Sequence, residues 1–347
     1  MPANLPETLG ALVESGYKSR SVKEEIRTNL VQRISGGLEV FPGIVGFDQS
    51  VIPQIQNAIL AGQDIILLGE RGQAKSRIIR LMVDLLDEHI PFIKGSEIND
   101  DPLHPISQYG IEILAEDKND TKLGWLSRDD RYSEKLATPD VSVADLIGEI
   151  DPIKVAEGRY LSDALAIHYG MIPRTNRGLF CINELPDLTE RIQVSLFNLM
   201  QERDIQIKGH QVRLPLDMII VATANPEDYT NRGRIITPLK DRYGAQIRTH
   251  YPAEVSQEMA IVKQEYKKFS DSDQLVKTPE FMKDIIGEIT HLARRSPEIN
   301  QRSGVSLRVS ISNFETMIGQ AFRRSLATHS VSSPRISDLS YLIASTI

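Results

Sequence analysis

One short run of small residues ends in a lysine and a hydroxyl, a combination suited to holding phosphate. Residues 69–76 read Gly69, Glu70, Arg71, Gly72, Gln73, Ala74, Lys75 and Ser76. Glycines let successive backbone N–H groups curl around an anion, and a helix that begins there adds the positive end of its dipole. A lysine in this place neutralises the β- and γ-phosphates of a nucleotide, and the hydroxyl after it binds Mg²⁺. The run therefore predicts a nucleotide-phosphate loop.

The run departs from the usual pattern at one position. The pattern GxxxxGK[ST] asks for glycine where Ala74 stands. Alanine is small, and we expect Ala74 to take the right-handed conformation of a helix start, which is open to it. A chance glycine-rich turn is the alternative reading. The apolar strand predicted before the run and the helix predicted after it favour the phosphate loop.

Polar side chains follow two further apolar runs. Asn183 and Glu184 come after residues 179–182, and Asn225 comes after residues 219–224. A carboxylate at such a strand end can activate water as a general base, and we assign this role to Glu184. Asn183 can hydrogen-bond a metal-bound water without adding charge. Asn225 would hold the attacking water opposite Glu184, with a simple Asn-Pro turn as the alternative.

The missing charge at position 183 has two opposite expected effects. If only a charge is missing, Asn183→Asp should hold Mg²⁺ more tightly, because charge matters most where the dielectric is low. A new carboxylate beside Glu184 would instead raise the pKa of Glu184 by like-charge repulsion and impair catalysis.

Arginines suited to bidentate phosphate contact follow these runs. Arg232, Arg234 and Arg242 come after the third apolar run, and Arg308 opens a predicted helix much later in the chain. Any single arginine is more often a solvated surface residue, so only the order of the whole set makes these four candidates.

The elements that must position these residues form an α/β pattern. Fully apolar runs at 65–68, 178–182 and 218–222 predict buried parallel strands, and helical spacing predicts helices at 51–60 and 75–88. Because the carboxyl ends of parallel strands share one edge of a sheet, the candidate residues should meet there. Alternating residues at 205–214 predict a hairpin. Asp187, with Glu190 three residues later, predicts a capped helix start.

Three segments follow from this pattern. We predict a helical lead-in at 1–40, a nucleotide-binding α/β domain at 41–251 with helices flanking a parallel sheet, and a small all-helical domain at 252–347. Within the α/β domain, residues 96–140 are polar and predict a loop-rich surface insertion.

Composition excludes several classes of protein. Among 347 residues, 40 Lys and Arg face 47 Asp and Glu, and this net charge of -7 argues against nucleic acid as the main partner. The single Cys181 excludes an internal disulfide. The sequence shows no signal peptide and no run of 18 apolar residues, so we expect a cytoplasmic protein without a membrane partner.

Taken together, the motifs resemble the AAA+ ATPases, and within them the branch of the magnesium chelatase ATPase subunit and the MoxR-type ATPases. The resemblance covers about residues 40–325. It implies that 69–76 is the Walker A loop, with Arg77 beside it, and that Asn183 and Glu184 end Walker B. It further implies that Asn225 is sensor 1, that Arg242 is the arginine finger and that Arg308 is sensor 2. Ile44 and Val45 would belong to the loop that packs on adenine. Arg234 is the reserve arginine finger.

The resemblance also implies an activity and partners. It implies hydrolysis of ATP with Mg²⁺ by a homo-oligomeric, hexameric ring. Such a ring would remodel a protein substrate or a von Willebrand A-type partner, or assist metal insertion. A nucleotide-dependent switch with little turnover is one alternative, motivated by Asn183. A DNA- or transcription-associated motor is another, although the sequence holds no GAFTGA string and the 204–214 hairpin carries only Lys208, His210 and Arg213 as basic residues.

Overall fold

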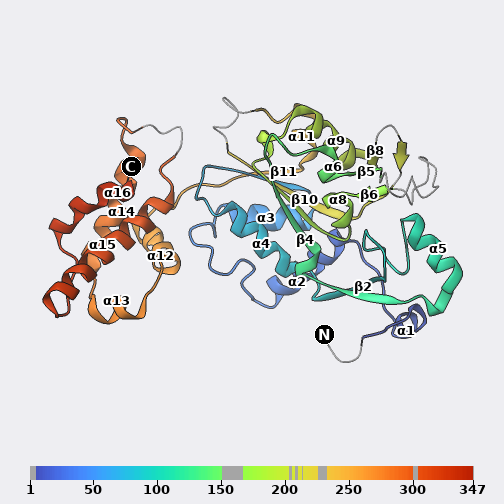
Figure 1. The fold of residues 1–347 in the computed structure, drawn as a ribbon, viewed down its shortest axis with the longest axis horizontal. Coiled ribbons are helices and arrows are strands. Elements are labelled where there is room, and N and C mark those ends of the chain that lie inside the picture. The colour runs from blue at the N-terminus through green and yellow to red at the C-terminus, as the bar shows by residue number, and fades with distance from the viewer. Residues whose placement is uncertain are drawn as a thin grey trace. The chain divides into compact units, whose positions relative to one another are not determined.

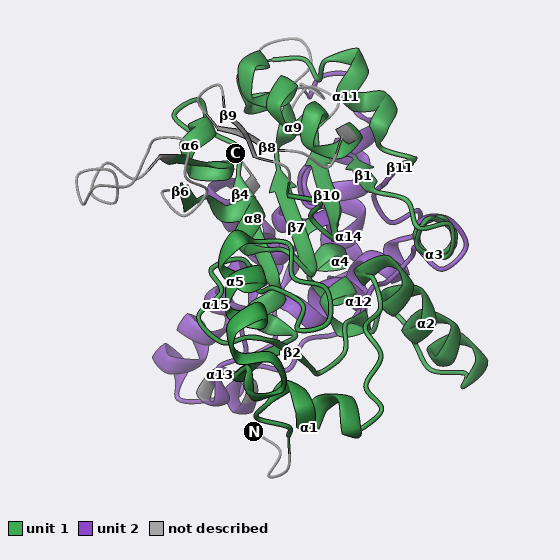
Figure 2. Ribbon diagram, turned by 90° about the vertical axis from the view of Figure 1, so that its right-hand side faces the viewer, with its two compact units in different colours: residues 1–42, 52–68, 76–247 green, residues 43–51, 69–75, 248–347 purple. Residues whose placement is uncertain are grey.

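The chain divides into two compact units, which are drawn in different colours in Figure 2. The computed structural model describes residues 5–150, 167–202, 205–207, 210–212, 214–225, 233–299 and 304–346. Unit 1 comprises residues 1–42, 52–68 and 76–247, and unit 2 comprises residues 43–51, 69–75 and 248–347. Unit 2 thus includes two short loops from the first quarter of the sequence as well as the C-terminal region.

A five-stranded sheet forms the centre of unit 1 (Figure 1). Its strands, in spatial order, are β11 (Ala245–Arg248), β1 (Ile65–Leu68), β10 (Met218–Ala224), β7 (Gly178–Asn183) and β4 (Tyr132–Leu136). β1, β10, β7 and β4 run parallel, with Leu68 opposite Ala224 and Ala222 opposite Ile182. The carboxyl ends of β1, β10 and β7 therefore lie at one edge, and the predicted parallel α/β sheet is confirmed.

Helices and short strands surround this sheet. The helices are α1 (Leu9–Glu14), α2 (Val22–Ser35), α3 (Val51–Leu60), α4 (Lys75–Met82), α5 (Gln108–Asp117), α6 (Val143–Leu146), α8 (Met171–Arg174), α9 (Glu190–Glu202) and α11 (Thr237–Arg242). The short strands are β2 (His89–Ile93), β3 (Leu123–Ser127), β5 (Gly148–Ile150), β6 (Ile167–Tyr169), β8 (Ile205–Ile207) and β9 (His210–Val212). β8 pairs antiparallel with β9, so the predicted hairpin is confirmed.

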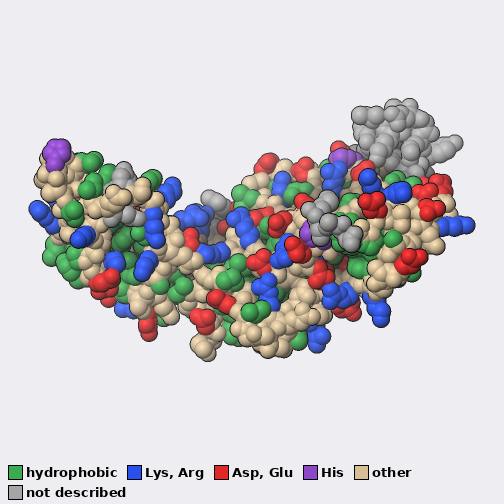
Figure 3. All heavy atoms as spheres, turned by 90° about the horizontal axis from the view of Figure 1, so that it is seen from below, with side chains coloured by type: hydrophobic (Ala, Val, Ile, Leu, Met, Phe, Trp, Pro, Cys, Tyr) green, Lys and Arg blue, Asp and Glu red, His purple; other side chains and the backbone are tan. Residues whose placement is uncertain are grey.

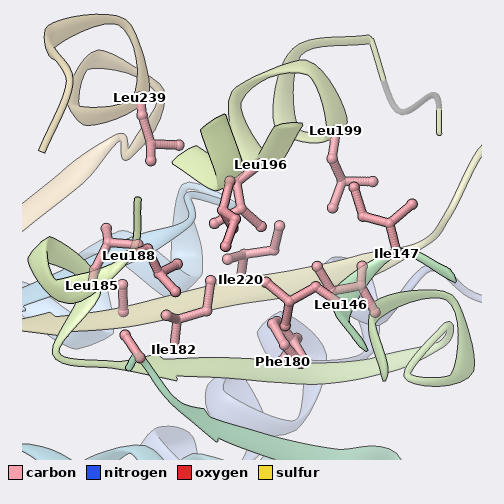
Figure 4. Close-up of a cluster of buried hydrophobic side chains, with 14 of the residues drawn as sticks. Leu146, Ile147, Phe180, Ile182, Leu185, Leu188, Leu196, Leu199, Ile220 and Leu239 are labelled. Atoms are coloured by element: carbon pink, nitrogen blue, oxygen red, sulfur yellow. The ribbon is translucent and has the colours of Figure 1, made fainter. Parts of the chain in front are cut away.

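One face of the sheet packs into the main apolar core (Figure 4). Phe180 and Ile182 of β7 meet Leu196 and Leu199 of α9 in this cluster. Burial of each such side chain contributes roughly 1.5–3 kcal/mol. Because neighbouring strand residues point to opposite faces, Cys181 and Asn183 of β7 face away from this core.

Within unit 1, the helical lead-in packs against the rest of the unit through a buried ion pair. Arg131 donates from both terminal nitrogens to the carboxylate of Glu25 on α2, at 2.6 Å each. Both side chains are almost completely buried. A buried charge needs such a partner, so this contact fixes α2 beside the segment that leads into β4.

Residues 96–140 differ from the expected loop-rich insertion. They hold α5, β3 and β4, and β4 pairs with β7 as an edge strand of the central sheet. The strand was missed because Tyr132–Leu136 carries charged residues, which are common on edge strands. β3 pairs antiparallel with β2, outside the central sheet.

The predicted helix cap at Asp187 is wrong. Asp187 is the last residue of a 3-10 turn, η5 (Leu185–Asp187), and α9 begins only at Glu190. The backbone carbonyl of Thr189 accepts the first bonds of the helix, from Ile192 and Gln193.

The C-terminal part of unit 2 is helical, as expected. Its elements are α12 (Val255–Glu265), α13 (Ser270–Leu275), α14 (Glu280–Arg295), α15 (Leu307–Thr328), η7 (Ile336–Leu342) and α16 (Ile343–Thr346). Their core contains Val262, Met282, Ile286, Phe314, Met317 and Leu342. In the part of the chain that the structure describes, none of the helices combines the length and the apolar character needed to cross a bilayer.

Candidate functional site

The glycines of the 69–75 loop leave no room for side chains. The loop leaves β1 after Leu68 and enters α4 at Lys75. A Cβ on Gly69 would overlap the Thr249 hydroxyl, and a Cβ on Gly72, which has φ 78°, would overlap the Ser306 hydroxyl. These close approaches keep the loop as bare backbone, which is the form that a phosphate cradle needs.

Ala74 adopts a left-handed conformation, with φ 54°. The expectation of a right-handed helix start at this residue is therefore wrong. An L-residue in the left-handed region costs about 1–2 kcal/mol, a cost that glycine avoids. The glycine of the common pattern thus serves the backbone turn into α4, and this chain makes the same turn with a strained alanine.

Side chains within unit 2 hold the loop in shape. Gln73 accepts hydrogen bonds from the Thr249 hydroxyl at 2.6 Å and from the backbone N–H of Glu70 at 3.1 Å. The Tyr251 hydroxyl donates to the backbone carbonyl of Arg71 at 2.8 Å. The side chain of Gln73 therefore stabilises the loop conformation. Only the backbone N–H of Gln73 remains as the predicted phosphate contact.

Lys75 lies folded over the loop that precedes it. Its Nζ donates to the backbone carbonyl of Glu70 at 2.7 Å and to that of Gly69. The ammonium is buried at the first residue of α4, where the helix dipole already favours an anion. Ser76 and Arg77 follow in the first turn of α4 and are half-buried.

The general-base candidate Glu184 stands in an unusual backbone conformation at the end of β7. Its φ of 57° and ψ of 47° are left-handed. The backbone N–H of Glu184 donates to the Thr223 hydroxyl at 3.1 Å, and that hydroxyl donates to Oδ1 of Asn183 at 3.2 Å. A threonine of β10 thus fixes the exit of β7, and strained residues held in this way are frequent at functional sites.

Asn225 follows β10 directly and is only 3% exposed. Its Oδ1 has no hydrogen-bond partner among the described residues. A buried acceptor without a partner costs about 1–3 kcal/mol, so an external partner at this position is favoured.

Asn183 contacts a carboxylate that sequence reasoning missed. Its Nδ2 donates to Oε1 of Glu134 on β4. The other carboxylate oxygen of Glu134 accepts bonds from Arg80 at 3.0 and 3.1 Å and from the Tyr132 hydroxyl at 2.9 Å. Burial, with the charge of Glu134 beside it, raises the pKa of the Cys181 thiol to about 12, so Cys181 stays protonated. We find no sequence signal that would have singled out Glu134.

The structure does not bring Arg242 to the strand ends. Arg242 is the last residue of α11 and donates to Gln201 of α9 at 2.6 Å. Its guanidinium lies 5.4 Å from the centre of the Phe197 ring. Arg234 is exposed, and Arg232 lies outside the described residues.

Arg308 lies in the first turn of α15, as expected. Its backbone N–H donates to the Ser306 hydroxyl at 3.2 Å, and its side chain is exposed. Because Ser306 lies against Gly72, unit 2 places this turn beside the 69–75 loop. A Cβ on Gly304 would likewise overlap the Glu70 carboxylate.

Two glycines with positive φ flank the residues of the predicted adenine-packing loop. Ile44 is buried and Val45 half-buried between Gly43 and Gly46, whose φ angles are 74° and 82°.

The described residues contain no group of three or more His, Cys, Asp or Glu able to hold a metal. A Mg²⁺ ion at this site would therefore depend on nucleotide phosphates together with Ser76, which is how this ion is often bound.

Comparisons with known proteins give two kinds of match, one to a domain family and one to curated relatives. A family described as the Sigma-54 interaction domain matches residues 155–241. The magnesium-chelatase subunit ChlI of Nostoc is 26% identical over 287 residues, covering 78% of this chain and 70% of the relative. The ChlI subunit of Euglena gracilis is 28% identical over 224 residues, and this chain spans 58% of its length.

Several solved structures match over most of the chain, and one example is a magnesium chelatase complex. A chain in the complex between subunits BchI and BchD of magnesium chelatase has 18% identity and a TM-score of 0.48, over 87% of this chain and 92% of that chain. The expected resemblance to magnesium-chelatase-type AAA+ ATPases is confirmed by the curated relatives, and the expected parallel sheet flanked by helices is confirmed by the structure of unit 1.

Proposed function

We propose, from its resemblance to the AAA+ ATPases of the magnesium chelatase branch, that this chain hydrolyses ATP with Mg²⁺ at the carboxyl edge of its parallel sheet. One observation carries the proposal. The 69–75 loop, Glu184 and Asn225 each follow directly on one of the three neighbouring strands β1, β7 and β10, whose carboxyl ends coincide. In open parallel sheets this edge is where ligands bind.

Some residues of the site are assigned to binding of the nucleotide and Mg²⁺, and others to catalysis. Lys75 and the bare N–H groups of the loop would bind the phosphates, and Ser76 would bind Mg²⁺. Mg²⁺, when bound, neutralises charge that develops on the phosphates. Glu184 would take the proton of the attacking water, and Asn225 would orient that water through its unsatisfied Oδ1.

Assembly and partners are part of the same proposal. The relatives are named as subunits of magnesium chelatase, and we propose that this chain likewise forms a homo-oligomeric ring. In that ring Arg242 would reach the nucleotide of a neighbouring subunit, and Arg308 would sense the nucleotide of its own. The ring would remodel a protein, of which a von Willebrand A-type partner or a metal-insertion partner are the two candidates.

Two substitutions test the site. Lys75→Ala should abolish ATP binding, because the phosphates lose their cation at the start of α4. Glu184→Gln should bind ATP normally and stop phosphate release, because Glu184 acts on water. Glu190→Gln, an exposed glutamate at the start of α9, is the matched control. Calorimetry and steady-state phosphate release separate the variants, and unchanged turnover in Glu184→Gln would refute its role.

The same assay decides between turnover and a switch. A nucleotide-dependent switch is motivated by Asn183, which lacks the charge of an aspartate. It would bind ATP in the parent protein and release no phosphate. Measurable release that disappears in Glu184→Gln rules this alternative out.

A transcription-associated motor is the second candidate, because the Sigma-54 interaction domain matches residues 155–241. The sequence holds no GAFTGA string, and on the face shown in Figure 3 acidic and basic side chains are interspersed. Retention on a DNA column at about 0.15 M salt would favour this candidate, since phosphate contacts dominate such binding.

A further inference from the structure

The amide of Asn183 is held at both ends. Its Nδ2 donates to Glu134 on one neighbouring strand, and its Oδ1 accepts from Thr223 on the other. Leu136 is opposite Asn183 and Glu134 is opposite Cys181, so Glu134 and Asn183 are diagonal neighbours on the sheet face away from the main core. The side-chain amide therefore has one defined orientation, with its oxygen toward β10.

Glu134 is itself fixed by three donors. Arg80 supplies two bonds and Tyr132 one, all to the oxygen that does not face Asn183. Arg80 belongs to α4, the helix that begins with Lys75. Charge-assisted bonds of this kind hold a carboxylate in place. A hydrogen-bonded chain thus runs from α4 through Glu134, Asn183 and Thr223 to the backbone of Glu184.

A surface ion pair is too weak an explanation for this arrangement. The Arg80 side chain is 65% exposed, and exposed pairs contribute little. The bond from Asn183 to Glu134 is different, because Asn183 is only 8% exposed and its amide has little access to water. This bond therefore favours asparagine over aspartate at position 183.

We propose that Glu134 is a positioning residue that carries the negative charge normally expected at position 183. The charge stands one strand away, on β4, and Glu134 holds the nitrogen of Asn183 so that the Asn183 oxygen faces Thr223 on β10. An aspartate at position 183 would set two carboxylates at hydrogen-bonding distance, so asparagine is the residue that the neighbour requires. The proposal rests on the proposed function, since it assigns a role toward the metal of that site.

Four proteins test the proposal as a cycle: the parent, Glu134→Gln, Asn183→Asp and the double variant. Thermal unfolding is measured without nucleotide, and ATP affinity is measured by calorimetry with Mg²⁺ and with EDTA. The ratio of the two affinities is the Mg²⁺-dependent gain. Glu112→Gln, an exposed glutamate on α5, is the control.

Asn183→Asp should lower Tm by several degrees. The double variant should recover that Tm, because its new glutamine amide on β4 can donate to its new carboxylate on β7. Glu134→Gln should keep Tm near that of the parent and reduce the Mg²⁺-dependent gain on the order of ten-fold, since one charge near the ion is lost. The double variant should regain most of that gain. A merely structural role for Glu134 would change Tm and leave the gain unaltered.

Two results would overturn the proposal. One is an Asn183→Asp protein with the parent's Tm and a larger Mg²⁺-dependent gain, which would mean that Glu134 does not oppose a charge at position 183. The other is an unchanged gain in Glu134→Gln. If the proposed function is wrong, the parent protein binds no ATP either with Mg²⁺ or with EDTA. The Tm values of the four proteins would still show whether Glu134 and Asn183 interact.

Discussion

The Thr223 hydroxyl accepts a hydrogen bond from the backbone N–H of Glu184 over 3.1 Å. A side chain of β10 thereby holds the main chain of β7 at the residue that turns left-handed. The position of the Glu184 carboxylate thus depends on a neighbour that does not need to touch a substrate.

We expect Thr223→Val to lower kcat about ten-fold or more and to leave the KM for ATP nearly unchanged. Valine removes the acceptor of the hydrogen bond from the Glu184 N–H, a loss of about 0.5–1.5 kcal/mol, and frees the strained turn. Thr223→Ser keeps the hydroxyl and should retain most of the activity. Steady-state phosphate release checks both variants, and a valine variant with parental kcat would contradict the role.

Ala74→Gly should stabilise the protein by about 0.5–1 kcal/mol. Glycine removes the left-handed cost of about 1–2 kcal/mol, and the greater freedom of the unfolded chain returns part of it. The control is Ala260→Gly on the exposed side of α12, which should destabilise by about 1 kcal/mol. Urea unfolding measures both, and a loss of stability in Ala74→Gly would show that φ 54° is not the strained feature.

Mixed rings should reveal whether Arg242 acts on a neighbouring subunit. Glu184→Gln and Arg242→Ala should each be inactive alone, and their mixture should regain part of the activity, because some interfaces then contain both Glu184 and Arg242. Within one chain Arg242 is already bound to Gln201, so Gln201→Ala is the control for loss of that contact. Mixed rings that assemble and stay inactive would exclude the trans role.

Acid should weaken the C-terminal helices through Asp338. Arg324 donates to its carboxylate at 2.7 and 2.9 Å. Burial alone would raise the pKa of Asp338, but these bonds and the N–H of Arg335 outweigh it and hold the pKa below its usual range. A lowered folded-state pKa gives stability that is present above the unfolded-state value and is lost as pH falls through the folded-state value.

Asp338→Asn should therefore be less stable than the parent at pH 7, on the order of 2 kcal/mol. The difference should shrink in acid as the pH falls through the lowered folded-state pKa of Asp338, where the parent loses the charged partner of Arg324. Thermal unfolding between pH 3 and pH 7 measures this. Parallel curves for the two proteins would show that the pair does not contribute to acid sensitivity.

The sequence predicted those features that depend on local pattern. Apolar runs followed by polar residues placed Lys75, Glu184 and Asn225 at the ends of neighbouring strands, because strand ends are visible in hydropathy. Glu134 was not predictable, since a charged edge strand resembles a loop. The conformation of Ala74 and the bond from Arg242 to Gln201 depend on packing between segments distant in sequence, which spacing alone does not encode.

The contact between Asn183 and Glu134 also constrains the order in which the two residues can be exchanged during evolution. If the aspartate arises first, the protein passes through a form with two facing carboxylates. If glutamine first replaces the glutamate, the intermediate has two facing amides, which can hydrogen-bond to each other. The route through paired amides therefore avoids the repulsion between two carboxylates, and Glu134 favours asparagine at position 183 for as long as it is kept.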